Sequence, residues 1–75
     1  MPYTFFNYVA DGKVWLANVE MPGEEENIEQ YVIATSNHEA IYNANALYPT
    51  ATNVTVGSTP VTPQQYREQI RQELG

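Results

Sequence analysis

The stretch VIATSNHEAIYNANALYPTATNVTV constrains the fold more than any other part of the chain. Ser36 and Glu39 form a capping-box pattern in which each side chain can satisfy a backbone N–H at the other's position. Apolar residues then recur at helical spacing until Pro49, which cannot continue a helix. Runs that favour β structure flank this helix at residues 28–35 and 52–58. The sequence therefore predicts a strand, a helix and a strand in succession.

The first part of the chain predicts a β-hairpin. The dipeptide Asp-Gly at residues 11–12 separates two runs rich in aromatic and β-branched residues, and both of its positions tolerate the positive φ of a tight turn. We therefore expect strands at residues 3–10 and 13–21. In this register Trp15 lies opposite Tyr8, on the face that we assign to the core.

The other face of this predicted hairpin is also apolar, which is more than a sheet with one solvated face requires. The apolar residues on it are Tyr3, Phe5, Val9, Val14 and Leu16. Because a bare apolar patch of that size favours association, we expect either a cover from the same chain or an interface with another molecule.

A second helix is predicted at about residues 63–74. Thr62 is a suitable N-cap, Pro63 suits the first helical position, and Gln65 completes a second capping box. A connection rich in Pro, Gly, Ser and Thr precedes it.

The element order β-β-β-α-β-α predicts a mixed sheet of about four strands with a helix packed on one face. We therefore expect an α+β fold, formed by a single small acidic domain of residues 1–75.

Composition and charge exclude several classes of function. The chain has no cysteine, so disulfides and thiolate metal sites are excluded. Its formal charge of −6 repels phosphate backbones, so we expect no direct nucleic-acid binding. The N-terminal stretch has no basic region before its apolar run, and no run approaches the about 18 apolar residues of a membrane helix. We expect a cytoplasmic protein without membrane association, in the host cytoplasm if a phage encodes it.

Few residues could carry chemistry. His38 is the sole histidine, and the position four residues later is Tyr42, so the pattern of zinc proteases is one ligand short. Asp11 is the sole aspartate, and its place in a turn already explains it. We expect no enzymatic activity, no metal and no cofactor.

The segment PGEEENIEQ contains the densest run of charge. Glu24, Glu25, Glu26 and Glu29 have two open interpretations, a solvated connection or a binding surface for a basic partner.

Two of the three basic residues, Arg67 and Arg71, lie one turn apart on the C-terminal helix. These two arginines also have two open interpretations. They could pair with the glutamates or with solvent, or they could contact a partner.

The segments VADGKVWLANVE, YVIATSNHEAIYNANALYP and VTV, with a glutamate-bearing loop between the first two, resemble the small host-RNA-polymerase inhibitors of T7-like phages. The resemblance spans about residues 9–60 and implies bacterial RNA polymerase as the target. Members of that family hold the polymerase through basic residues on the last strand, where this chain has Val56 and Ser58. The hypothesis is that Arg67 and Arg71 replace those contacts.

The first functional hypothesis is thus a non-enzymatic phage-type interaction protein that binds and inhibits a host protein through its acidic loop. The alternative is a virion structural protein, such as a capsid decoration protein, that uses the apolar hairpin face. A small acidic binding domain with an unidentified partner is a third hypothesis. The sequence leaves the oligomeric state open.

Overall fold

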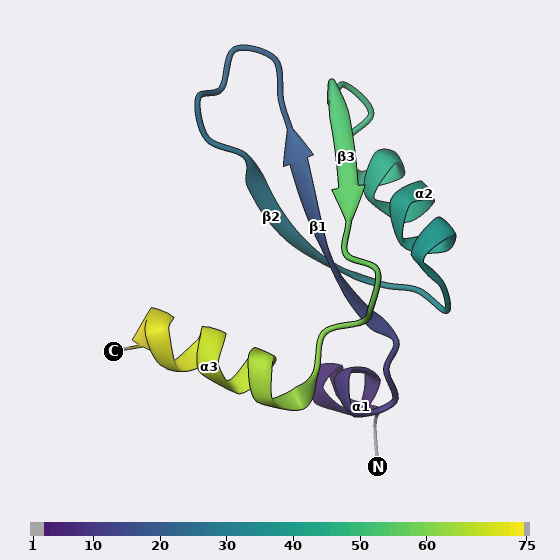
Figure 1. Ribbon diagram of the computed structural model, residues 1–75, viewed down its shortest axis with the longest axis vertical. Coiled ribbons are helices and arrows are strands. Elements are labelled where there is room, and N and C mark those ends of the chain that lie inside the picture. Colours follow the sequence, from purple (N-terminus) through teal and green to yellow (C-terminus); the bar gives the residue numbers. More distant parts are fainter. Residues whose placement is uncertain (1–2, 75) are drawn as a thin grey trace.

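The computed structural model describes residues 3–74 and has an α+β architecture (Figure 1). In chain order its elements are α1 (Phe5–Ala10), β1 (Val14–Glu20), β2 (Ile28–Ile33), α2 (Asn37–Leu47), β3 (Asn53–Val56) and α3 (Pro63–Leu74). The sheet has three strands in the order β2-β1-β3, and both pairings are antiparallel. The α+β class is confirmed, whereas the expectation of about four strands in a mixed sheet is wrong because the first predicted strand is a helix.

Capping at both ends explains why residues 5–10 form a helix. At its N-terminus the Asn7 N–H donates to Thr4 Oγ1 (3.3 Å), and the Thr4 N–H donates to Asn7 Oδ1 (2.9 Å). This is a capping box with asparagine in place of the usual glutamate or glutamine. A helix this short is not stable alone, so its packing against other elements must hold it.

The Asp-Gly dipeptide ends this helix instead of turning a hairpin. Gly12 has a φ of +73°, and its N–H donates to Val9 O (3.1 Å). The Lys13 N–H donates to Tyr8 O (3.0 Å), which completes a Schellman motif. A tight hairpin and a helix C-cap both need a residue in the left-handed region, so the same dipeptide serves either one.

Strand β1 is the centre of the sheet. On β2, Trp15 lies opposite Val32, so the predicted pairing of Trp15 with Tyr8 is wrong. On β3, Ala17 lies opposite Val56 and Val19 opposite Val54. Trp15, Ala17 and Val19 all face α2, because alternate residues of a strand share one face.

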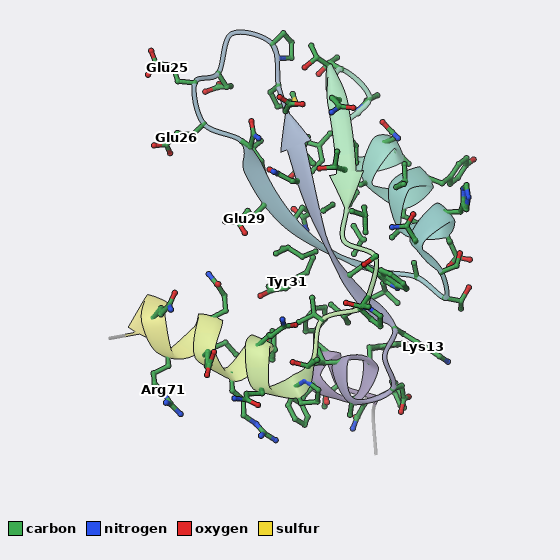
Figure 2. The ribbon with its side chains drawn as sticks, viewed as in Figure 1. Lys13, Glu25, Glu26, Glu29, Tyr31 and Arg71 are labelled. Atoms are coloured by element: carbon green, nitrogen blue, oxygen red, sulfur yellow. The ribbon has the colours of Figure 1, made fainter. Side chains whose placement is uncertain are left out.

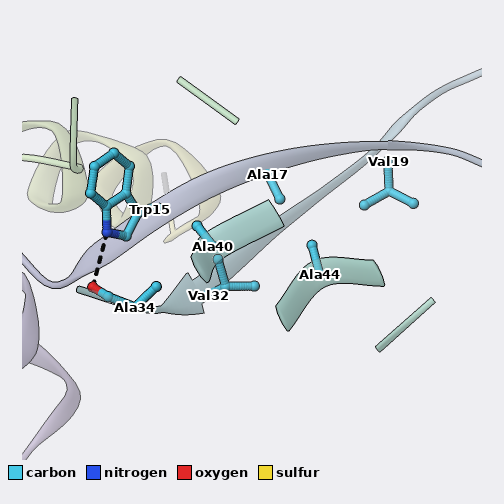
Figure 3. Close-up of a cluster of buried hydrophobic side chains, with 7 residues drawn as sticks. All are labelled: Trp15, Ala17, Val19, Val32, Ala34, Ala40 and Ala44. Carbon is cyan, nitrogen blue, oxygen red and sulfur yellow. Dashed lines mark hydrogen bonds between the residues drawn. The ribbon is translucent and has the colours of Figure 1, made fainter. Parts of the chain in front are cut away.

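The face that packs against α2 forms the larger hydrophobic core, here called the α2 core (Figure 3). Its buried members are Trp15, Ala17, Val19, Val32, Ala34, Ala40 and Ala44. Most of these side chains are alanine or valine, so the helix packs closely on the sheet. Trp15 contributes the one large ring of this core, and its polar atom Nε1 donates to the buried Ala34 carbonyl at 3.0 Å.

A second core, the α1–α3 core, covers one end of the opposite sheet face. Its buried residues are Val9, Val14 and Val61. Phe5, Tyr8, Tyr31 and Tyr66 pack around them, and the rings of Phe5, Tyr31 and Tyr66 lie within 5.4 to 6.1 Å of one another. This core shows how the chain itself covers part of the second apolar face.

The N-terminus of α3 agrees with its prediction. The Thr62 N–H donates to Gln65 Oε1 (3.0 Å), and the Gln65 N–H donates to Thr62 Oγ1 (3.1 Å). Val61 is buried in the α1–α3 core and Tyr66 packs against that core, which is the arrangement of a hydrophobic staple across such a cap.

Two asparagines of α2 tie the helix to both edges of the sheet. Asn43 Nδ2 donates to Ile33 O on β2 (2.9 Å). Asn37 Nδ2 donates to Val56 O on β3 (3.2 Å) and to Gly57 O (2.8 Å). Carbonyls on the free edge of a strand are the groups that would pair with another chain, so these amides protect both edges.

The first prediction concerns Trp15. Trp15→Phe keeps most of the buried ring but leaves the Ala34 carbonyl without its donor, which should cost about 1–3 kcal/mol of unfolding free energy. Trp15→Ala also leaves a cavity and should cost about 3–5 kcal/mol. Urea denaturation followed by circular dichroism measures both. Equal stability of the parent and the Phe variant would show that the hydrogen bond contributes nothing.

The second prediction concerns the amide from α2 to β2. Asn43→Ala should destabilise the protein by about 0.5–1.5 kcal/mol more than Asn45→Ala, because only the former removes a bond to the sheet. Asn45 donates to Ile41 O within the same helix, so the two substitutions share the change in helix propensity. Equal midpoints in urea would contradict the role of Asn43 at the edge.

Candidate functional site

The end of the β1–β2 hairpin carries the densest charge in the molecule. Its acidic residues, here called the acidic hairpin end, are Glu20, Glu24, Glu25, Glu26 and Glu29, all of them exposed. Figure 2 shows Glu25, Glu26 and Glu29 in a column along one side of the hairpin, pointing away from the rest of the protein. The structure therefore brings Glu29 of β2 into line with the loop glutamates.

This segment accounts for nearly all of the net charge. It contains five of the nine acidic residues and no basic residue, so it carries −5 of the formal −6. The remainder of the chain is close to neutral. The charge is therefore concentrated at one end of the protein and is not spread over its surface.

A tight turn positions the loop glutamates. Pro22 and Gly23 occupy its two central positions, Gly23 has a φ of +82°, and the Glu24 N–H donates to Met21 O (3.3 Å). Proline followed by a residue with positive φ is typical of a type II turn. The run of glutamates thus begins directly where this turn ends.

Glu20 belongs to the acidic hairpin end although the sequence analysis did not select it. It lies opposite Asn53 on β3, and Asn53 Nδ2 donates to Glu20 Oε2 (2.9 Å). The signal that could have found it is the two-residue period of β1, which puts Glu20 on the same face as Asn18. Asn18 lies opposite Glu29, so that face carries both carboxylates.

The structure does not bring Arg67 and Arg71 to the acidic hairpin end. The Arg67 guanidinium lies over the Phe6 ring, 5.2 Å from its centroid, which links α3 to α1. Arg71 points away from the sheet, on the far side of α3 (Figure 2). Any contact that these arginines make with a partner therefore belongs to a different surface.

The predicted apolar interface is not a single exposed face, because it depended on a first strand that is a helix. Val9 and Val14 are 1% and 0% exposed and lie inside the α1–α3 core. Phe5 is half-buried beside them. Tyr3 and Leu16 are exposed, Tyr3 before α1 and Leu16 on the sheet.

The two residues considered for catalysis have ordinary places. His38 is exposed in the first turn of α2, and Asp11 is the C-cap of α1. Among residues 3–74, no three side chains of His, Cys, Asp or Glu gather as a metal site would require. Within the same residues, no helix combines the length and the apolar character that a membrane crossing needs.

Comparison of the chain with protein families, with curated protein sequences and with solved structures found no match in any of the three.

The third prediction separates the two arginines. Arg67→Gln should lower the unfolding free energy by about 0.5–1 kcal/mol, because it removes the cation–π contact that joins α3 to α1. Arg71→Gln removes the same charge one turn away and should change stability by less than about 0.5 kcal/mol. Thermal and urea unfolding of both variants measure the difference, and equal effects would show that the contact with Phe6 has no structural role.

Proposed function

We propose that the protein is a non-enzymatic interaction module whose acidic hairpin end binds a basic surface on another protein. The observation that carries the proposal is the concentration of −5 of the formal −6 charge in one projecting hairpin end. Exposed charges of one sign contribute little to folding, but they attract an oppositely charged partner over a Debye length of about 8 Å. This arrangement suits fast, salt-sensitive association.

Bacterial RNA polymerase is the target that the resemblance to T7-like phage inhibitors suggests. The order β1, acidic loop, β2, α2 and β3 is the order of elements on which that resemblance is based. A carboxylate-rich hairpin can occupy a basic groove that otherwise holds the phosphates of DNA. We therefore propose that the protein acts as a phage-type inhibitor in the host cytoplasm by competing for such a groove.

The virion hypothesis has less support, because two of the five residues of its interface are buried in the α1–α3 core. Binding to another basic protein remains the second proposal, since the charge distribution alone does not select the polymerase.

The fourth prediction concerns the acidic hairpin end. Replacing Glu24, Glu25, Glu26 and Glu29 by glutamine should slow association with the partner and flatten its salt dependence, because both effects arise from long-range attraction. Stability should change by less than about 0.5 kcal/mol per site, since all four side chains are exposed. Binding to immobilised polymerase at low and high salt measures the association rate.

A matched pair of single variants tests whether position matters as well as net charge. Glu25→Gln and Glu68→Gln each remove one exposed carboxylate, the first from the hairpin end and the second from α3. Only Glu25→Gln should slow association. Equal slowing by both would show that overall charge, and not the acidic hairpin end, drives binding.

In vitro transcription with a bacterial polymerase holoenzyme tests the named target. The parent should inhibit transcription. The quadruple glutamine variant should need a concentration at least about tenfold higher for the same inhibition. If the parent fails to inhibit at high excess and shows no binding, the polymerase assignment is wrong.

A further inference from the structure

We propose that the open face of the sheet and α3 form a trough for an extended peptide segment that carries one apolar anchor flanked by lysine or arginine. The open face is the sheet face turned away from α2, with Leu16, Asn18, Glu29 and Thr55 on it. The proposal rests on the proposed function and deepens it, because it names the kind of segment that a basic partner would insert.

Three adjoining hollows make up this trough. One of about 310 Å³ lies between the sheet and α3, and it is lined by Leu16, Tyr31, Gly57, Thr59, Val61, Gln65 and Gln69. A second of about 460 Å³ continues along the sheet past Asn18, Asn27, Glu29 and Thr55. A third, of about 300 Å³, joins Glu29 to Gln69. Leu16 lines all three, so they meet around its side chain.

The trough has an apolar floor and is also lined by carboxamide side chains. Leu16, which is 37% exposed, and the side chains of Tyr31 and Val61 provide the floor at the α3 end. Asn18, Asn27 and Gln69 also line it. A carboxamide both donates and accepts hydrogen bonds, so it can pair with either the N–H or the C=O of an extended backbone.

The charge of the trough selects a cationic segment. Glu29 lies at its hairpin end, and none of the residues that line the three hollows is basic. Figure 2 shows Glu29 and Tyr31 projecting on the same side of β2, above α3, with Glu25 and Glu26 further along the same line. Lys13 and Arg71 point elsewhere. An inserted segment would thus pass from an apolar site to one that contains Glu29 and no basic residue.

The spacing along β2 gives the spacing expected in the ligand. Glu29 is two residues from Tyr31 on β2, and Glu26 lies in the loop just before the strand. An extended ligand rises by about 3.3 Å per residue, as a strand does. Its basic residues should therefore lie two and about four positions from its apolar anchor, because alternate residues of an extended chain project on the same side.

Addition of a strand to the free edge of β2 is a different mode of binding, and the structure disfavours it. The Ala34 N–H donates to Lys13 O, so by the alternation of an antiparallel pair the carbonyls of Tyr31 and Ile33 point away from β1. Gln30 Nε2 donates to Tyr31 O (3.0 Å), and Asn43 Nδ2 covers Ile33 O. The ligand is therefore placed on the open face and not at the edge.

The test uses fluorescein-labelled synthetic peptides and the full-length protein. The probe is an extended threonine-rich peptide with one leucine and with arginines two and about four positions after it. One control peptide has glycine in place of leucine, and another has the arginines adjacent to the leucine. Fluorescence anisotropy should show that the probe binds at least about fivefold tighter than either control. Equal affinity for all three peptides would overturn the trough and leave only unspecific charge attraction.

Gly57 offers a substitution that blocks the trough without straining the backbone. It has no positive φ, and an added Cβ would meet only Thr59 O, at 3.7 Å. Continuing the register of β1 and β3 by one residue places it beside Leu16 on the open face. Gly57→Leu should weaken probe binding about tenfold, whereas Ser58→Leu adds the same side chain outside the hollows and should leave it unchanged. Urea midpoints verify that both variants fold.

The outcomes separate this inference from the proposed function. If Gly57→Leu binds the probe as the parent does while the glutamine variants of the acidic loop still lose polymerase binding, the trough is wrong and the proposed function stands. If the probe binds, prefers its own spacing and is blocked by Gly57→Leu, the trough is correct even when the polymerase is not inhibited. Weakening by Ser58→Leu equal to that by Gly57→Leu would also overturn the trough.

Discussion

The arrangement of the whole molecule depends on β1, which pairs with a strand on each side and contributes to a core on each face. Trp15, Ala17 and Val19 point into the α2 core, and Val14 points into the α1–α3 core. The two-residue period of a strand allows this division, and a shift of the register by one residue would reverse it. The hydrogen bond from Trp15 to the Ala34 carbonyl fixes the position of the largest side chain in this arrangement.

The two cores leave different parts of the sheet exposed. Helix α2 covers its face with alanines and ties both edges through Asn37 and Asn43. Helices α1 and α3 cover only one end of the opposite face, so the other end stays open to solvent. Carboxylates can gather at the open end because no packing requires apolar residues there. The packing of α3 at one end of this face therefore forms one side of the proposed trough, while the acidic hairpin end lies at the other end.

The candidate site was only partly predictable. The run of Glu24 to Glu26 is visible in the sequence, and the two-residue period of β1 places Glu20 on the face of Asn18, but the contact of Glu20 with Asn53 required the pairing of β1 with β3. Arg67 illustrates the opposite case, because its spacing from Arg71 suggested a joint basic surface. The Phe6 ring lies beneath Arg67 only because residues 5–10 form a helix that meets α3. A contact between segments about sixty residues apart cannot be inferred from local spacing.

By itself the sequence determined the elements whose signals are local: the two capped helices at residues 37–47 and 63–74, the proline stop and the acidic loop. It did not determine the state of residues 3–10, because the Asp-Gly dipeptide fits a hairpin turn and a helix C-cap equally well. Tertiary structure decided that question. As a helix, this segment buries Val9 against Val14 and Val61. The predicted first strand would have paired with β1, but β2 and β3 occupy both edges of β1. Packing against Val61, about fifty residues away, therefore acted together with the local caps at Thr4 and Gly12 to select the helix.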